Sequence, residues 1–386
     1  MLVRAATVWT PDGPRRDHTV QVGDEGRIEQ VRPAVAGDPL ALEGLLVPGL
    51  VNAHTHLELS GLGLVPGGAG LPAWVAQVMR SRDRASRQAA AQAAEALREV
   101  GTAVVCDVSN AGDTAALLQD AGLAGVVQVE VLGFGRADVP ARVASIESFH
   151  GSGGLVRRRP AAHAPYSTAP AIVQAVVDWD GPGAASPPTV HVGESEAEVA
   201  FLRDGTGPFA ALLDALGRDW RWFEAPGCSP VAWLDRNGWL GRLIVVHGVH
   251  TTAGDRVRLA QTGTAVCLCP RSNQHVEGRL PEAGALHAAG VPLCLGTDSL
   301  ASSPDLDVLA EIPVLARAFP EVPVGVWLEA ATAGGARALG FPQHGRIVPG
   351  ARPGLLLLEV SDVAALAEAA PPRRWVITPQ GRADGG

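Results

Sequence analysis

The sequence contains no lysine, since all 31 of its basic residues are arginine. This absence excludes enzymes that form a Schiff base on lysine and phosphate-binding loops that depend on a lysine. It also excludes a pair of metal ions bridged by a carbamylated lysine. Arginine cannot take over these roles, because its guanidinium stays protonated.

Aromatic residues are also scarce, at 4% of the chain, whereas hydrophobic residues make up 47%. We therefore expect a core of aliphatic and alanine side chains. No apolar run approaches the roughly 18 residues of a membrane-spanning helix, so no membrane partner is expected. The formal net charge is −9 and no block of like charge is longer than Arg157–Arg159, which argues against a nucleic-acid partner.

The cysteine count and the first residues bear on the cellular compartment. Five cysteines, an odd number in a long chain, fit a reducing compartment better than a disulfide framework. Residues 1–13 lack the apolar segment that follows the basic start of a signal peptide. These features predict a cytoplasmic protein.

The two ends of the chain share a rhythm of short strands separated by turn residues. Residues 1–48 contain four such segments and residues 345–386 contain three, and neither region shows a helical period. We expect both ends to build one small β-sandwich domain, which a larger domain, residues 49–344, interrupts.

Between the ends, continuous apolar runs alternate with helical patterns. Runs without polar alternation are typical of parallel strands that are buried on both faces. The eight runs end near His56, Asp107, Glu130, His163, His191, His247, Cys267 and Gly296. Eight strand–helix units over about 290 residues predict an α/β fold of the (β/α)8 TIM-barrel type. A doubly wound open sheet is the competing fold, but the glycine-rich phosphate loop typical of it is missing.

Helical patterns follow most of these runs. The longest expected helices cover residues 71–100, 196–216 and 324–339. The shorter ones cover residues 112–121, 138–149, 169–177, 229–239, 252–261 and 280–289. An aromatic-rich stretch around Trp220–Phe223 could form a lid, although packing of this loop against the barrel is the favoured interpretation.

Histidines gather at the predicted strand ends. His54 and His56 are two residues apart, so on a strand they point to the same side. Histidines also stand at the fourth, fifth and sixth ends, and an aspartate, Asp298, follows the eighth. Because barrel active sites lie at the carboxyl ends of the strands, this convergence predicts a metal site.

The motifs resemble those of the amidohydrolase superfamily, in particular its deaminase branch. The resemblance is carried by Val47–His56, by His191 with Glu194 three residues later, by His247, and by Gly296-Thr-Asp298. It covers nearly the whole chain. It implies one divalent metal ion per chain, with Zn²⁺ preferred and Fe²⁺ as the alternative. The implied ligands are His54, His56, His191 and Asp298.

The resemblance also implies catalytic roles. A bound zinc ion lowers the pKa of its water to about 7. Glu194 would move a proton from this water to a ring nitrogen of the substrate. Asp298 would accept the second proton, and His247 would hydrogen-bond the attacking hydroxide.

Two segments resemble the corresponding segments of aminodeoxyfutalosine deaminases of menaquinone biosynthesis, namely His54–Ser60 and Pro270–His275. The implied substrate is an adenine nucleoside derivative with a carboxyphenyl ketone on its 5′ side. Glu58 would then accept hydrogen bonds from ribose, and Arg271 would hold the carboxylate. The remaining candidate pocket residues are His163, Asn273 and His275.

Several alternatives remain open at this point. The same site could serve an S-adenosylhomocysteine, adenosine or guanine deaminase, a chlorohydrolase or a cyclic amidase. A metal-binding protein without catalytic activity is the hypothesis from a different class of function. The expected partner is a small-molecule substrate, and the sequence leaves a homodimer open.

Overall fold

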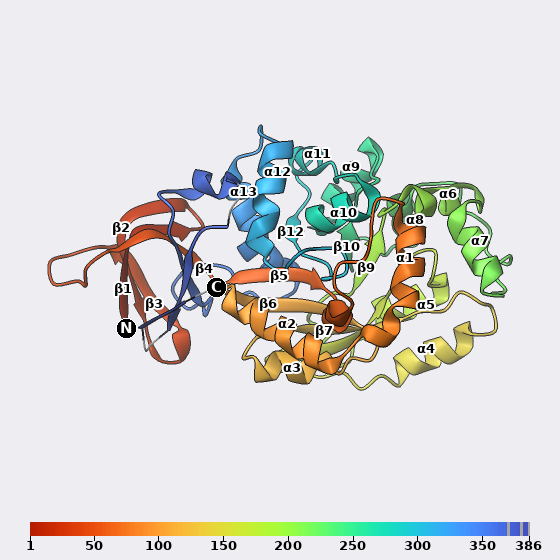
Figure 1. The fold of residues 1–386 in the computed structure, drawn as a ribbon, viewed down its shortest axis with the longest axis horizontal. Helices are drawn as coiled ribbons and strands as arrows, with labels where there is room; N and C mark the ends of the chain where they lie inside the picture. The colour runs from red at the N-terminus through yellow and green to blue at the C-terminus, as the bar shows by residue number, and fades with distance from the viewer. Residues whose placement is uncertain (369–370, 379–380, 385–386) are drawn as a thin grey trace.

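A computed structural model describes residues 1–368, 371–378 and 381–384. The molecule has two parts, which Figure 1 shows side by side: a β-sheet built from the chain ends, and a larger part in which strands and helices alternate. No helix among the described residues has the length and apolar character that crossing a membrane requires.

The terminal sheet combines strands from both ends of the chain. Its strand order is β15-β14-β13-β4-β1-β2-β3. The strands are β1 (Leu2–Thr10), β2 (Gly13–Val22), β3 (Ile28–Pro33), β4 (Leu42–Pro48), β13 (Leu355–Leu358), β14 (Arg374–Thr378) and β15 (Gly381–Asp384). The ends meet where β4 pairs with β13, with Pro48 opposite Leu355. The described strands form one seven-stranded sheet, so the predicted two-sheet sandwich is not confirmed.

The larger part contains two parallel four-stranded sheets, and all eight predicted strands are present. The first sheet holds β5 (Leu50–Thr55), β6 (Thr102–Ser109), β7 (Ala124–Val131) and β8 (Val156–Ala162). The second holds β9 (Thr189–Val192), β10 (Ile244–His247), β11 (Val266–Leu268) and β12 (Leu293–Leu295). Every residue of β5, β9 and β10 is buried, as continuous apolar runs predict.

Backbone hydrogen bonds connect the two sheets at both seams. The amide of His191, in β9, donates to the carbonyl oxygen of His163 at the end of β8 over 2.9 Å. At the other seam, the amide of Asp298 donates to the carbonyl oxygen of His54 over 3.1 Å. A Cβ on Gly296 would lie 2.7 Å from Cβ of His54, so only glycine allows this approach. The carboxyl ends of the strands therefore face one common region.

The helices follow the strands, and two of the predicted helices are each broken into two. The predicted helix over residues 71–100 is two helices, because Ser86 starts the second by accepting a hydrogen bond from the amide of Ala89. The predicted helix over 196–216 also ends early, at Gly205 with a φ of 71°, and restarts at Pro208.

Helices α1 to α7 cover Leu71–Arg80, Arg87–Glu99, Thr114–Asp120, Val139–Glu147, Pro170–Asp178, Glu196–Asp204 and Pro208–Ala215. Helices α8 to α14 cover Pro230–Arg236, Ala253–Thr262, Pro270–Glu277, Ala283–Ala288, Ile312–Ala318, Val324–Glu329 and Gly335–Ala338. A π-helical turn, Ala330–Gly334, separates the last two. Helices α10 and α12 were not anticipated from the sequence, and α10 carries three of the candidate pocket residues.

Candidate functional site

The centre of the site is a buried pair of imidazoles at the carboxyl end of β5, one in the strand and one directly after it. The ring centroids of His54 and His56 lie 4.8 Å apart. His54 is completely buried, and neither of its ring nitrogens has a hydrogen-bond partner among the described residues. A buried polar group without a partner costs free energy, so this ring is suited to an additional ligand.

His191 supplies a third imidazole from β9. Its Nε2 lies 3.3 Å from Nε2 of His56, while its Nδ1 lies 2.9 Å from the backbone carbonyl oxygen of His163. A carbonyl oxygen only accepts, so Nδ1 carries the proton. The lone pair of Nε2 is therefore directed at the other histidines, which is the arrangement of a metal-binding histidine.

Asp298 completes the cluster after β12. Its Oδ1 lies 3.7 Å from Nε2 of His54 and 3.6 Å from Nε2 of His56. Its Oδ2 accepts hydrogen bonds from the hydroxyls of Ser272 at 2.6 Å and Ser302 at 2.8 Å. The backbone φ of Asp298 is +57°, a left-handed conformation that costs a non-glycine residue on the order of 1 kcal/mol. This strained conformation lowers the stability of the fold, and it directs one carboxylate oxygen at the imidazoles.

These residues fit a divalent metal ion. Ligand atoms of His54, His56 and Asp298 lie within 4.8 Å of one another, and so do those of His54, His191 and His247. Burial lowers the pKa of His54 and of His191 well below the ordinary value, so both rings are neutral, as metal ligands must be. Mixed imidazole and carboxylate donors suit zinc and ferrous iron.

Two further groups stand beside the cluster. Oε1 of Glu194 lies 3.6 Å from Nε2 of His247, and both residues are buried. Burial raises the pKa of Glu194 well above its usual range, and the carboxylate of Asp298 adds to the rise. Burial lowers the pKa of His247 to about 4. A carboxylate of raised pKa is a stronger base than an ordinary one, so Glu194 can accept a proton and pass it to a substrate.

A cavity of about 230 Å³ opens onto these groups. Glu58 lines its mouth, where its carboxylate accepts hydrogen bonds from the hydroxyl of Ser109 and the amide of Asn110. His163 lines it too, with its ring centroid 5.0 Å from that of His191. The predicted residues that the structure brings to this cavity are His56, Glu58, His163, His191, Glu194, His247 and Asp298.

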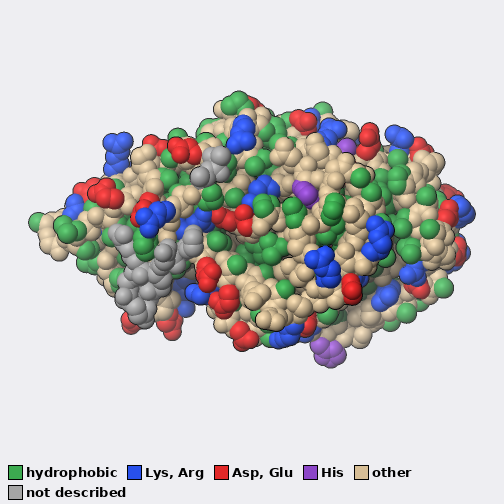
Figure 2. All heavy atoms as spheres, viewed as in Figure 1, with side chains coloured by type: hydrophobic (Ala, Val, Ile, Leu, Met, Phe, Trp, Pro, Cys, Tyr) green, Lys and Arg blue, Asp and Glu red, His purple; other side chains and the backbone are tan. Residues whose placement is uncertain are grey.

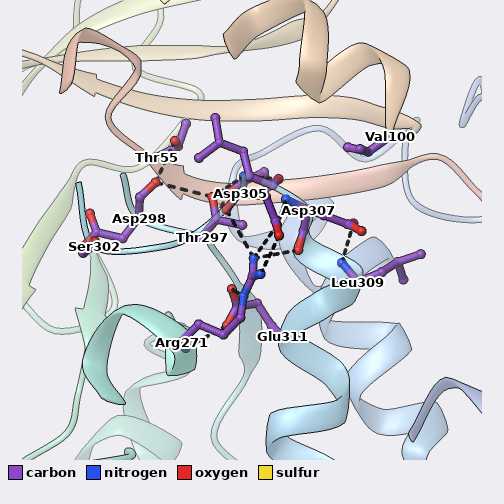
Figure 3. Close-up of polar contacts among 12 residues, drawn as sticks. Thr55, Val100, Arg271, Thr297, Asp298, Ser302, Asp305, Asp307, Leu309 and Glu311 are labelled. Atoms are coloured by element: carbon purple, nitrogen blue, oxygen red, sulfur yellow. Dashed lines mark hydrogen bonds and ion pairs between the residues drawn. The ribbon is translucent and has the colours of Figure 1, made fainter. Parts of the chain in front are cut away.

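Arg271 lies elsewhere, which corrects the role expected for it. Its Nε donates to Glu311 at 2.6 Å, and its two terminal nitrogens bind the carboxylate of Asp305 at 3.0 and 2.8 Å. Figure 3 shows the guanidinium enclosed by these partners and Asp307. Because α12 was not anticipated, the buried Glu311 was missed as its partner. Arg271 fixes the segment that follows Asp298, and its donors are not directed at the cavity.

The other two candidates on α10 also lie outside the cavity lining. The side-chain amide of Asn273 lies 3.0 Å from Nδ1 of His247, behind that ring. Nε2 of His275 lies 2.7 Å from the backbone carbonyl oxygen of Val65 and holds the segment before α1. Both residues support the site from outside, because their helix begins at Pro270 and turns these side chains away from the cavity.

Sequence reasoning missed Glu130 as a site residue, although it ends a predicted strand. Its Oε1 lies 3.7 Å from Nδ1 of His191, and it lines the cavity. Its position at the end of a predicted strand could have identified Glu130 as a site residue. The hydroxyls of Ser272 and Ser302 carried no such signal, because serine occurs throughout the chain.

The aromatic stretch after α7 packs into the fold, as favoured from the sequence. The ring of Phe134 stacks on Trp222 at 5.7 Å and meets Phe223 edge to face at 5.2 Å. Trp220 and Phe223 are buried. The three aromatic residues of this stretch, Trp220, Trp222 and Phe223, do not line the cavity beside the histidines.

Known proteins resemble this chain over most of its length. The aminodeoxyfutalosine deaminase of Deinococcus radiodurans is 32% identical over 317 residues, which are 77% of this chain and 73% of that protein. The 5-methylthioadenosine/S-adenosylhomocysteine deaminase of Halobacterium salinarum is 30% identical over 381 residues, 92% of this chain and 83% of that protein.

Solved structures share the fold. A zinc-bound adenosine deaminase from Xanthomonas campestris has a TM-score of 0.76 at 27% identity, covering 96% of this chain and 89% of its own. The aminofutalosine deaminase of Helicobacter pylori has a TM-score of 0.77 at 20% identity, covering 99% of both chains. The sequence model of the amidohydrolase family matches residues 45–379. The chain therefore belongs to the amidohydrolase family, and it is a hydrolase that acts on carbon–nitrogen bonds.

Proposed function

We propose that this protein is a metal-dependent deaminase that releases ammonia from an adenine nucleoside derivative, with 6-amino-6-deoxyfutalosine as the first candidate. The observation that carries the proposal is the placement of Glu194 and His247 beside the cluster of three imidazoles and Asp298. The proposal includes a closed (β/α)8 barrel. The hydrogen bonds that connect the two sheets at both seams support this closure. It also includes a single divalent ion, preferably zinc, held by His54, His56, His191 and Asp298.

The reaction moves one proton from water to the ring and the other to the departing amine. A divalent ion bound by the four ligands supplies the Lewis acidity that makes water nucleophilic at neutral pH. Glu194 takes one proton from the water and delivers it to the ring nitrogen next to the amine-bearing carbon. Asp298 accepts the second proton and passes it to the departing ammonia. His247, with Nε2 directed at Glu194, donates a hydrogen bond to the attacking oxygen.

Glu58 and the relatives support a nucleoside substrate. The carboxylate of Glu58 is held at the cavity mouth by Ser109 and Asn110, with Arg82 at 3.8 Å. The side-chain amide of Asn110 also donates to this carboxylate, so one lone pair remains to accept a hydrogen bond from a ribose hydroxyl. Two relatives with at least 30% identity over more than two thirds of this chain are named as an aminodeoxyfutalosine deaminase and a 5-methylthioadenosine/S-adenosylhomocysteine deaminase.

The test is ammonia release from a panel of substrates. We expect the metal-loaded enzyme to deaminate 6-amino-6-deoxyfutalosine with the highest kcat/KM. Adenosine, 5-methylthioadenosine and S-adenosylhomocysteine complete the nucleoside set, and guanine and a chlorotriazine represent the other reactions. No ammonia from any nucleoside, with full metal content, would overturn the proposal.

The second candidate is deamination of 5-methylthioadenosine or S-adenosylhomocysteine. The Halobacterium relative favours it, because that similarity extends over 92% of this chain. The same panel separates the two candidates by the ratio of their kcat/KM values.

A further inference from the structure

A second cavity, of about 340 Å³, continues from the first. Six side chains line both cavities, so the two are chambers of one cleft: Val75, Met79, Arg82, Leu132, His163 and Tyr166. The first chamber is lined by three of the four proposed metal ligands, His56, His191 and Asp298, and by Glu194. The second lies among α1, α4 and α7, which Figure 1 places at the end of the molecule opposite the terminal sheet.

The walls of the second chamber are apolar and partly open to solvent. Met79, Leu132 and Leu216 line it, and their exposed fractions are 50%, 37% and 47%. Large exposed apolar side chains that converge on one cavity indicate a surface that a ligand covers. The ring of Tyr166 stacks on that of Phe209 at 3.6 Å and provides a flat, buried floor. A chamber of this size and lining suits an aryl group.

Arginine side chains give this apolar chamber a positive rim. Arg82, Arg142 and Arg218 line it with a single carboxylate, Asp138, although the chain as a whole has a formal net charge of −9. On the face shown in Figure 2, by contrast, acidic and basic side chains are interspersed.

Arg142 is the arginine that remains available to a ligand. Arg218 pairs with Asp138 at 3.2 Å, and Arg82 lies 3.8 Å from Glu58. No carboxylate of the described residues lies within ion-pair distance of Arg142. Its side chain lies across Gly133, where a Cβ would come within 3.0 Å of Cγ of Arg142. This glycine gives the arginine room to reach the chamber.

The outer wall of the chamber is held in place before any ligand binds. The amide of Arg136 donates to the carbonyl oxygen of Asp219, and the indole of Trp222 donates to that of Phe134. Together with the pair between Asp138 and Arg218, these contacts tie the loop before α4 to the segment after α7. A preformed wall lowers the ordering cost of binding.

We propose that the second chamber is the subsite for the part of the substrate remote from the amine, and that it selects an aryl substituent bearing a carboxylate. The aryl group would cover Met79, Leu132 and Leu216, and the carboxylate would pair with Arg142. This inference rests on the proposed deaminase function and names the specificity residue for it. It replaces Arg271, whose donors are already engaged.

The test uses two probes that differ only in the carboxylate: 5′-deoxy-5′-(carboxyphenylthio)adenosine and 5′-deoxy-5′-(phenylthio)adenosine. A hydrogen-bonded charge pair changes affinity by about tenfold to a hundredfold. We therefore expect the native enzyme to favour the carboxylated probe by about this factor in kcat/KM. Arg142→Gln is expected to remove most of this preference, chiefly through KM.

Arg16→Gln is the matched control, because Arg16 is exposed on β2 of the terminal sheet and the substitution removes the same charge. It should retain the preference. Arg142→Glu should reverse it, so that a probe carrying an aminomethylphenyl group is favoured over the carboxylated one. A preference that is absent in the native enzyme, or equal in the Gln variants at 142 and 16, would overturn the proposal.

Calorimetric binding of both probes separates this inference from the proposed function. If neither probe is deaminated but the carboxylated one binds more tightly through Arg142, the deaminase assignment fails and the subsite stands. If both probes are deaminated at equal rates and bound equally, the subsite fails and the deaminase assignment stands.

Discussion

The side-chain amide of Asn273 lies 3.0 Å from Nδ1 of His247. An amide N–H donates here, so Nδ1 accepts and the ring proton is on Nε2, which faces Glu194. His247 also has a φ of +72°, a strained conformation that the surrounding fold must maintain. Asn273 therefore fixes both the tautomer and the direction of this imidazole.

Asn273→Asp should lower kcat/KM by about 10-fold to 100-fold, the usual cost of losing a partner that orients a site histidine. The new carboxylate would attract a proton to Nδ1 and raise the pKa of His247. The acidic limb of the pH–rate profile should then move to higher pH. Asn237→Asp, an exposed change at the end of α8, is the control and should leave the profile unchanged. An unshifted profile in the Asn273 variant would contradict the tautomer assignment.

Glu194→Gln should lower kcat by about 10²-fold to 10⁴-fold, because glutamine cannot carry the proton. Metal content, measured by atomic emission, should stay at the native level, since Glu194 is outside the ligand set. Glu196→Gln is the matched control two residues along, where the carboxylate is exposed in the first turn of α6. Near-native activity of the Glu194 variant would remove this residue from the mechanism.

His191→Ala should reduce the bound metal and the thermal stability together. An ion present at about 1,000 times its Kd stabilises the folded state by about 4 kcal/mol, and this contribution is lost with the ion. A chelator should lower the Tm of the native protein in the same way, and added zinc should restore it. His150→Ala, at an exposed position, should change neither quantity. Full metal content in the His191 variant would show that the ligand set is wrong.

Arg271→Met tests the corrected role of that arginine. Glu311 is fully buried and would lose its charged partner, a change that typically costs about 3 to 5 kcal/mol. We expect a lower Tm, and equal losses of activity on the carboxylated and the neutral probe. A selective loss on the carboxylated probe would restore the expectation that Arg271 binds substrate.

The clustering of the proposed metal ligands could be predicted from sequence because it follows from strand geometry. His54 and His56 share a strand face, and the carboxyl ends of parallel strands meet, so distant motifs such as His191 and Asp298 converge. The residues of α10 could not be placed in this way. Their directions depend on where a helix begins, and Pro270 at the first turn started one where a loop was expected.

The arginine that we propose to bind the substrate was missed for a related reason. Arg142 is one of 31 arginines and lies on an ordinary surface helix. Its relevance comes only from the cavity that α1, α4 and α7 form together, which no local pattern encodes. The break of the predicted 196–216 helix at Gly205 is what turns α7 and Phe209 toward that cavity.

The stability of the protein should fall with rising pH through the carboxyl group of Glu198. This side chain is fully buried and accepts hydrogen bonds from the amides of Gly193 and Glu194. Burial raises its pKa from 4.5 to about 8, against the opposing effect of these two amides. Between these values the unfolded chain binds fewer protons than the folded chain, so stability decreases as pH rises, by at most about 1.4 kcal/mol per pH unit for this group.

Glu198→Gln removes the titration and should flatten the dependence of Tm on pH between about 5 and 8. This range spans the ordinary and the raised pKa of Glu198. The measurement is the difference in Tm between the native protein and the variant at several pH values, with Glu196→Gln as the exposed control. Parallel curves for the native protein and the Glu198 variant would mean that the carboxyl stays charged throughout. The two amides would then outweigh burial, and Glu198 would anchor the loop bearing Glu194 as a permanent carboxylate.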